Sequence, residues 1–315
     1  MSPATVAVHA SDLVKRFPEV LAVDRLSVEV KAGEIFGLVG PDGAGKTTAL
    51  RMLAGVLTPD SGSAMIAGFD IVRDAEAAKA FISYMPQRFG LYEDLTVDEN
   101  IRFYADIFGV SCTERVQRAS QLLNAANMTQ FGSRLAGKLS GGMKQKLGLV
   151  CALIHRPRVI LLDEPTNGVD PVSRRDFWQI LYSLVGEGVA IVMSTAYLDE
   201  AERCHRVALL HQGRILFSDT PSELKKHLRG SVVAVVSLFP RRVQTLLANV
   251  EGVLSVVLVG DGVHLVVDDA ERRIPELRSH MMSAAVPVQS IEHVAPSMED
   301  IFVAATSGRE GETGR

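Results

Sequence analysis

A glycine-rich loop carries the first residues whose types and spacing could do chemistry. Its sequence from Gly40 to Thr47, GPDGAGKT, places a glycine, four residues, a second glycine, a lysine and a threonine in the order of a phosphate-binding loop. Apolar residues 35–39 predict a buried strand before the loop, and residues 48–54 predict a helix after it. The glycines let backbone N–H groups point into one concave anion site, to which the helix adds its positive end. An ordinary glycine turn before a helix is the alternative.

We therefore predict that nucleotide phosphates bind along this loop and at the start of its helix. Lys46 can reach the outer phosphates, and the hydroxyl of Thr47 can bind a magnesium ion. The predicted nucleotide-binding residues of this segment are Gly40, Pro41, Asp42, Gly43, Ala44, Gly45, Lys46, Thr47 and Thr48.

Two neighbouring carboxylates end a second apolar stretch, VILLDEP at 159–165. Asp163 stands where a buried strand would meet the cleft, and it can hold a magnesium ion through water. Glu164 follows it and can orient or deprotonate an attacking water. The alternative is a pair of carboxylates that face solvent at a strand end, which the apolar run and the following Pro165 make the weaker interpretation.

Composition limits the classes of protein that this chain can belong to. Its 315 residues are 47% apolar and 22% charged, with a net charge of -4, which excludes a strongly basic nucleic-acid binder. Cys112, Cys151 and Cys204 lie far apart, which disfavours a disulfide framework or a zinc site and favours a reducing compartment. No apolar run approaches the ~20 residues of a membrane helix, and the first residues lack a signal-peptide layout. We expect a cytosolic chain whose membrane part, if any, is another chain.

The elements that position these motifs follow from the apolar patterns. Residues 5–13 and 21–30 alternate apolar and polar side chains, as in antiparallel strands beside the phosphate-binding unit. Residues 96–136 predict a helical insert, which begins with a capping box at Thr96–Glu99. Residues 159–163 and 189–193 predict buried parallel strands. We expect an α/β fold in which a phosphate-loop core carries an antiparallel β subdomain and a helical subdomain.

A change in composition at Arg229 predicts a second domain. The order βαββαβ over 230–306 is typical of a small ferredoxin-like sandwich, with Asp261-Gly262 as a hairpin turn. Residues 1–229 would then form the first domain, and the polar, glycine-rich residues 307–315 a disordered tail.

The motifs together resemble those of the nucleotide-binding subunit of an ABC transporter. The stretch LSGGMKQKL at 139–147, followed by LLDEP and lying downstream of GPDGAGKT, carries this resemblance, which covers roughly residues 5–228. The segment 230–306, which ends near PSMEDIF, resembles drug-export ATPases of the daunorubicin-resistance type. In those proteins a separate membrane protein forms the pore.

The resemblance implies roles for further residues. Phe17 becomes a platform on which the nucleotide base stacks, although the residues alone favour simple packing. Gln87 becomes a contact of magnesium and of the attacking water. Residues 88–100 would receive a helix of the membrane subunit. The implied magnesium contacts are Thr47, Gln87 and Asp163, and the implied catalytic residues are Glu164 and Gln87.

The glycine pair implies a second chain at the nucleotide. Ser140, Gly141 and Gly142 become a signature at a helix start, where their amides form an anion site for ATP held by a partner subunit. Asp170 becomes a contact across this head-to-tail dimer.

Two positions depart from the family pattern. Ala196 stands where these proteins usually have a histidine that contacts the γ-phosphate, and Asp42 stands where asparagine or serine is usual. A carboxylate beside phosphates needs a compensating cation or donor.

We expect a Mg2+-dependent ATPase that works as a homodimer and powers export of a drug-like or lipophilic molecule. Its permease would be a separate integral membrane protein, which would hold the cassette at the inner face of the cell membrane. Two alternatives remain at this point. One is an ATP-binding regulatory cassette with little hydrolysis, and the other is a soluble ABC-type ATPase outside transport.

Overall fold

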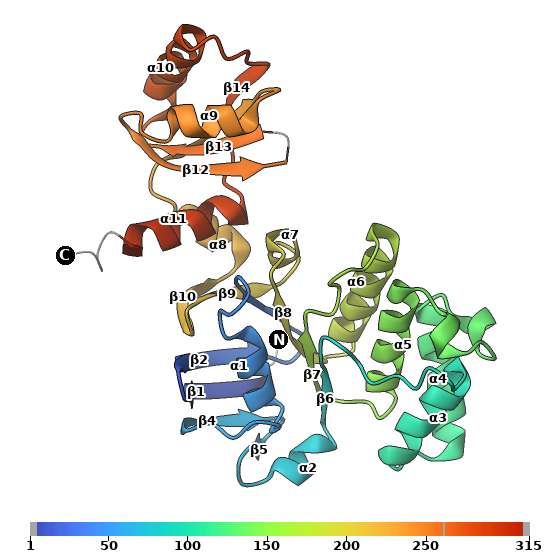
Figure 1. The fold of residues 1–315 in the computed structure, drawn as a ribbon. Helices are drawn as coiled ribbons and strands as arrows, with labels where there is room; N and C mark the ends of the chain where they lie inside the picture. The colour runs from blue at the N-terminus through green and yellow to red at the C-terminus, as the bar shows by residue number, and fades with distance from the viewer. Residues whose placement is uncertain (1–4, 261, 311–315) are drawn as a thin grey trace. The chain divides into compact units, whose positions relative to one another are not determined.

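The computed structural model describes residues 5–260 and 262–310, which form two compact units (Figure 1). One unit comprises the residues up to 197 together with 204–215, and the other comprises 198–203 together with the residues from 216 onward. This division comes earlier than the change in composition at Arg229. The reason is that α8 (Pro221–Lys226) packs against α11 (Met298–Glu310) within the second unit.

A six-stranded sheet forms the centre of the first unit, with the order β10-β9-β3-β8-β7-β6. The ladders β9–β3, β3–β8, β8–β7 and β7–β6 are all parallel. Every residue of β3, β7 and β8 is buried, as expected for strands covered on both faces. The strands are β3 (Ile35–Val39), β6 (Ile82–Met85), β7 (Val159–Asp163), β8 (Ala190–Thr195), β9 (Arg206–His211) and β10 (Arg214–Asp219).

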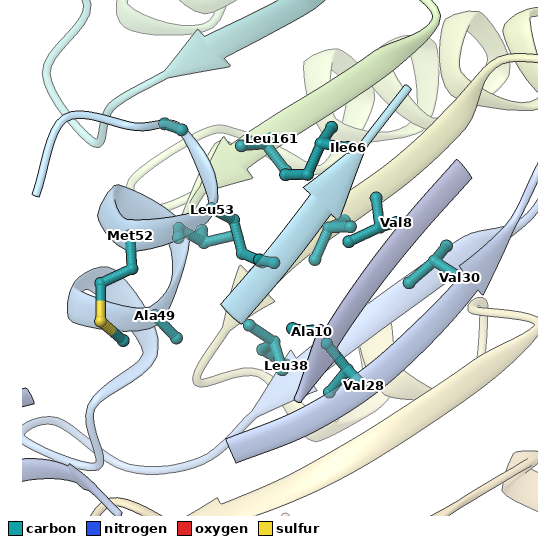
Figure 2. Close-up of a cluster of buried hydrophobic side chains, with 14 of the residues drawn as sticks. Val8, Ala10, Val28, Val30, Leu38, Ala49, Met52, Leu53, Ile66 and Leu161 are labelled. Atoms are coloured by element: carbon teal, nitrogen blue, oxygen red, sulfur yellow. The ribbon is translucent and has the colours of Figure 1, made fainter. Parts of the chain in front are cut away.

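An antiparallel sheet with the order β2-β1-β4-β5 lies beside this core, as predicted. The helix α1 (Lys46–Leu53) contacts β2, β7 and β8, so its apolar side chains lie in a core shared with both sheets. Figure 2 shows this shared core, to which Leu53 of α1, Leu38 of β3 and Ile66 of β4 all contribute. The strands are β1 (Val6–Phe17), β2 (Val20–Lys31), β4 (Ser61–Ile66) and β5 (Phe69–Asp70).

The helical insert forms as the pattern predicted. Thr96 caps α3 through the amide of Glu99, while the Glu99 carboxylate accepts from the Thr96 amide, which completes the capping box. The remaining helices of this unit include α5, which begins directly after Ser140. They are α2 (Ala75–Lys79), α3 (Val97–Ile107), α4 (Cys112–Ala125), η1 (Thr129–Phe131), η2 (Ala136–Lys138), α5 (Gly141–Leu153) and α6 (Pro171–Gly186).

The second unit contains the predicted βαββαβ order. Its four-stranded sheet has the order β12-β13-β11-β14, the ferredoxin-like arrangement, and its ladders are antiparallel. Val233, Leu265 and Leu277 belong to its own apolar core. The elements are α7 (Leu198–Ala201), α8, β11 (Ser231–Val236), α9 (Pro240–Leu247), β12 (Val253–Val259), β13 (Gly262–Val267), α10 (Ala270–Ser283), β14 (Ser290–Val294) and α11.

Two local expectations in this unit change. Disorder from Ser307 is wrong for residues 307–310, because α11 continues through Glu310. Each added helical residue gains a backbone hydrogen bond, and arginine and glutamate are good helix formers, so polar composition alone did not end the helix. Residues 311–315 and Asp261 of the expected turn lie outside the described residues. Gly262 opens β13 instead of lying in the turn, and it pairs with Val259.

Candidate nucleotide and magnesium site

The predicted chemical motifs meet at one edge of the parallel sheet. Gly40 follows β3, Asp163 ends β7 and Gln87 comes shortly after β6. Because the carboxyl ends of neighbouring parallel strands lie at the same edge, three distant motifs converge there. Register adds β8 to this group, since Asp163 lies opposite Ser194 in the β7–β8 ladder.

The phosphate-binding loop requires glycine at two positions for space. A Cβ atom on Gly40 would lie 2.2 Å from the carbonyl oxygen of Leu210. Gly45 has a φ of 101°, and a Cβ atom there would lie 2.2 Å from the carbonyl oxygen of Ala22. The loop therefore packs against Leu210 and Ala22 with bare backbone, and a side chain at either position would push it out of this conformation.

A cleft of about 480 Å3 opens over this loop. Its lining combines residues of the loop and of α1 with Gln87, Glu164 and Phe17. Phe17, at the end of β1, is 43% exposed. Part of the ring thus lies at the surface of the cleft, which suits the stacking role that the resemblance implies better than simple packing.

Lys46 is nearly buried and already has three oxygen partners. Its Nζ donates to the carbonyl oxygens of Gly40 at 2.8 Å and Pro41 at 3.0 Å. It also lies 3.1 Å from Oε1 of Glu164, so the predicted phosphate ligand and the predicted base form an ion pair. An entering γ-phosphate would have to take Lys46 from that carboxylate.

Asp163 gathers hydroxyl groups around a buried carboxylate. Thr47 Oγ1 donates to its Oδ1 at 3.0 Å, and Ser194 Oγ donates to the same oxygen at 2.6 Å. Tyr84 Oη donates to Oδ2 at 3.4 Å. Burial, with the charge of Asp163, raises the pKa of Tyr84, so the phenol keeps its proton.

The donor set at Thr47 and Asp163 fits magnesium. A hydroxyl and a carboxylate at hydrogen-bond distance supply the hard oxygen ligands that Mg2+ prefers, with room in the cleft for water and phosphate oxygens. Thr47 and Asp163 would hold the ion, and it would neutralise charge on the phosphates.

Glu164 leaves the strand in a left-handed conformation, with a φ of 46°. Its amide donates to Ser194 Oγ at 2.9 Å, and this contact helps to hold the unusual backbone. Its Oε2 accepts from Gln87 Nε2 at 3.1 Å and from Asn167 Nδ2 at 3.4 Å. Lys46 and Gln87 thus hold opposite oxygens of the carboxylate.

Ala196 leaves a cavity of about 210 Å3 beside Glu164. Asp42 and Tyr197 also line it, and Asp42 is exposed, so solvent screens its carboxylate. Open space thus lies next to the predicted base at the position where the resemblance implies a histidine side chain.

The signature residues stand apart from this cleft, whose lining within the described chain contains none of them. Ser140 caps α5 by accepting from the amide of Met143, and both Ser140 and Gly141 are exposed. Asp170 caps α6 through the amides of Val172 and Ser173. These hydrogen bonds, chiefly that from Ser173, lower the pKa of Asp170.

Sequence reasoning missed four residues around the carboxylates. Ser194 reaches both carboxylate positions because of strand register, and Tyr84 reaches Asp163 from the neighbouring strand β6. Asn167 and Tyr197 join the site through loops. Their one sequence signal is that each lies within three residues of a predicted site position.

Two family models match the chain. Residues 23–167 match the model described as ABC transporter. Residues 220–306 match the C-terminal domain of DrrA1-3-like ATP-binding proteins. The first match contains the phosphate-binding loop, Gln87, the signature and both carboxylates.

Relatives extend the match to the whole chain. The probable multidrug ABC transporter ATP-binding protein YbhF of Escherichia coli (strain K12) is 43% identical over 312 residues, which cover 98% of this chain and 53% of that protein. The chain thus spans about half the length of that relative. The daunorubicin resistance ATP-binding protein DrrA2 of Streptomyces coeruleorubidus is 34% identical, with coverage of 98% and 97%.

Solved structures agree with these matches. The ATP-binding subunit of an ABC transporter aligns with a TM-score of 0.65 and 30% identity, covering 70% of this chain and 92% of that one. In the described part of the chain every helix is too short or too polar to span a membrane. With its phosphate-binding loop, paired carboxylates, signature and DrrA-like second unit, the chain belongs to the family of ABC transporter ATP-binding proteins.

Proposed function

We propose that the chain hydrolyses Mg-ATP, with Glu164 as the base that activates water. The observation that carries this proposal is the placement of the Glu164 carboxylate in the phosphate cleft, between Lys46 and Gln87. One oxygen of a base held there can face a water next to a γ-phosphate on the loop.

The reaction would use residues that line the cleft. The loop amides and Lys46 would bind the β- and γ-phosphates, and Phe17 would stack on the base. Gln87 would orient the attacking water, and Glu164 would accept its proton. Positioning and electrostatic stabilisation would supply most of the rate enhancement.

Hydrolysis by the purified chain and by Glu164→Gln tests this directly, with ATP binding measured in parallel. We expect turnover in the native chain and a loss of about 100-fold or more in the variant, with ATP binding retained. Equal turnover in both would overturn the role of Glu164. Binding without turnover in both would favour the regulatory cassette, which the alanine at position 196 supports.

We further propose that the energy of hydrolysis drives export of a small drug-like or lipophilic molecule through a separate membrane permease. The names of YbhF and DrrA2 refer to multidrug transport and daunorubicin resistance, which supports this assignment. Through its permease the chain would lie at the cytoplasmic face of the membrane.

An apolar groove of about 300 Å3 offers a docking surface for such a permease. Val56, Phe89, Tyr104, Ile107 and Phe108 line it, and Phe89 belongs to the segment 88–100 that the family resemblance assigns to this contact. Val56 is 63% exposed and Ile107 59% exposed, although both are large apolar side chains. We propose that one cytoplasmic helix of the permease packs into this groove.

Aspartate substitutions can separate docking from folding. Val56→Asp and Ile107→Asp should abolish co-purification with the permease from native membranes while ATP hydrolysis of the isolated chain persists. Val116→Asp, at another 63% exposed valine outside the groove, should leave co-purification unchanged. Equal loss in all three variants, or in none, would contradict docking at this groove.

A further inference from the structure

The cavity at Ala196 is bordered by a hydrogen-bonded chain that reaches the predicted base. Tyr197 Oη donates to Oδ1 of Asn167 at 3.2 Å. Asn167 Nδ2 then donates to Oε2 of Glu164 at 3.4 Å. The carboxylate only accepts, so it selects the Nδ2–H end of the amide, and the phenol then donates to the carbonyl oxygen at the other end and holds the amide in that orientation.

The two oxygens of Glu164 have different partners. Oε2 accepts from two amides, those of Gln87 and Asn167, whereas Oε1 faces the ammonium of Lys46. When a γ-phosphate takes Lys46, Oε1 loses its partner while Oε2 keeps both. Oε1 is then the oxygen available for water, and the amides set its direction.

Tyr197 itself is held at both ends. Its amide donates to Thr195 Oγ1 at 2.9 Å, and the guanidinium of Arg174 lies 5.2 Å from its ring centroid. These contacts restrict an otherwise half-exposed side chain. The ring can therefore act as a fixed donor rather than as a mobile surface group.

We propose that Tyr197 and Asn167 are positioning residues that orient Glu164 and take over part of the geometric role left vacant by Ala196. Tyr197 acts through Asn167, and Asn167 acts on Oε2 of the base. This proposal rests on the proposed hydrolysis by Glu164 and adds the residues that hold its carboxylate.

Steady-state kinetics of Tyr197→Phe, Asn167→Asp and the double variant test the hydrogen-bonded link from Tyr197 through Asn167 to Glu164. Tyr197→Phe keeps the ring and removes the hydroxyl, so kcat should fall about three- to tenfold while KM for ATP stays within about twofold. Asn167→Asp keeps the acceptor for Tyr197 and removes the donor to Glu164, so its loss should be at least as large. Tyr182→Phe, at another half-exposed tyrosine outside the cleft, should retain the native kcat.

The double variant shows whether Tyr197 acts through Asn167 or whether the two residues affect kcat independently. If Tyr197 acts through Asn167, adding Tyr197→Phe to Asn167→Asp should cost little more, whereas independent roles would multiply the two losses. Restoring a polar side chain by Ala196→His in the Tyr197→Phe background should recover part of kcat.

The outcomes distinguish this proposal from the function on which it rests. One result is that the native protein hydrolyses ATP while kcat is unchanged in Tyr197→Phe or the losses multiply in the double variant. That result would overturn only the positioning role of Tyr197 and Asn167. A native protein that binds ATP without turnover would overturn the proposed hydrolysis, and with it the positioning role of Tyr197 and Asn167.

Discussion

Lys46 and Glu164 form an ion pair within the cleft. Their atoms lie 3.1 Å apart, and the side chain of Lys46 is only 4% exposed, so water screens the attraction weakly. When ATP binds, its γ-phosphate must therefore replace the Glu164 carboxylate as the partner of Lys46. Part of the attraction between the phosphate and Lys46 is then offset by the loss of the Lys46–Glu164 ion pair.

The first prediction follows from that competition. Glu164→Gln removes the charge that competes for Lys46, so ATP should bind about three- to tenfold more tightly than to the native chain. Fluorescent-nucleotide titration without magnesium measures this affinity while hydrolysis is suppressed. Asp42→Asn, which removes an exposed carboxylate from the same cleft, serves as the matched control for general charge repulsion. An equal gain in both variants would mean that the ion pair has no specific role.

The second prediction concerns the cavity at position 196. Ala196→His places an imidazole in about 210 Å3 of space beside Glu164, where it could contact the γ-phosphate and support the catalytic geometry. We expect kcat to rise above that of the native chain, with Ala196→Leu as a control that fills the cavity without a polar atom. An unchanged or lower kcat in the histidine variant would contradict this explanation of the alanine.

At the residue scale, sequence spacing located the groups of the cleft but not their partners. Lys46, Gln87 and Glu164 come from three motifs, and the strand ends bring them together as the order of motifs implied. The contact of Ser194 with Asp163 depends on the register of β7 and β8, which no local pattern specifies. The Lys46–Glu164 pair also escaped prediction, because each residue was assigned to a bound substrate.

At the element scale, the start of α5 depends on a close approach to α6. A Cβ atom on Gly142 would lie 2.4 Å from Ser173 Oγ and 3.0 Å from Asp170 Oδ2. The same atom on Gly141 meets nothing within 4 Å. Two adjacent glycines of one motif therefore carry different constraints.

The third prediction uses this pair as a matched test of stability. Gly142→Ala should lower the free energy of unfolding by about 1–3 kcal/mol, because the new methyl group forces α5 and α6 apart. Gly141→Ala should be neutral or slightly stabilising, since alanine favours the helix and nothing obstructs it. Urea unfolding of both variants without nucleotide measures the difference. Equal stabilities would show that the two helices adjust without cost.

Elements with strong local signals were predicted closely, and those set by packing were not. The capping box at Thr96 placed the start of α3. The end of α11 carried no such signal, so composition misled the prediction for 307–310. The compact units also divide at positions that depend on contacts between α8 and α11 rather than on local sequence.

Within the second unit, a buried ion pair connects β13 to the first turn of α11. His264 Nδ1 lies 3.1 Å from Oδ2 of Asp300, whose side chain is fully buried. The hydrogen bond with Asp300 raises the pKa of His264 above its usual 6.5. Burial opposes ionisation of Asp300, but hydrogen bonds from His264 and Ser297 outweigh it and lower the pKa of Asp300 below 3.8.

The fourth prediction is a pH dependence of this unit. A raised histidine pKa contributes stability that is complete below pH 6.5 and is lost as the pH rises through the folded-state pKa. The contribution of Asp300 is present above pH 3.8 and is lost as the pH falls through its lowered pKa. The stability difference between the native chain and His264→Gln should therefore shrink from pH 6 to pH 8.5, as measured by calorimetry. His280→Gln, at an exposed histidine, is the control, and a difference that stays constant with pH would contradict the assignment.

At the scale of the whole molecule, the predicted signature stands outside the cleft over the phosphate loop. Within the described residues, the cleft over the phosphate loop has no lining from 140–142, while Ser140 and Gly141 are exposed at the start of α5. A helix start suits an anion, and within the described residues the phosphate cleft of the same chain does not reach this helix start. We propose that two identical chains bind head to tail, so that Ser140 of each completes the site of its partner.

The last prediction tests this arrangement with two inactive variants. Lys46→Ala lacks the phosphate ligand but keeps its signature, whereas Ser140→Ala keeps the lysine and lacks the signature. A mixed dimer then has one site with both defects and one intact site, made of Lys46 from one chain and Ser140 from the other. If half of the dimers are mixed and their sites act independently, an equal mixture should recover about a quarter of the native ATPase activity. Activity no higher than that of the separate variants would require each chain to complete its own site, or the intact site to depend on its neighbour. ATP binding to covalently linked mixed dimers distinguishes those two cases. If the intact site depends on its neighbour for hydrolysis, ATP should still bind at that site with native affinity, whereas no intact site exists if each chain completes its own.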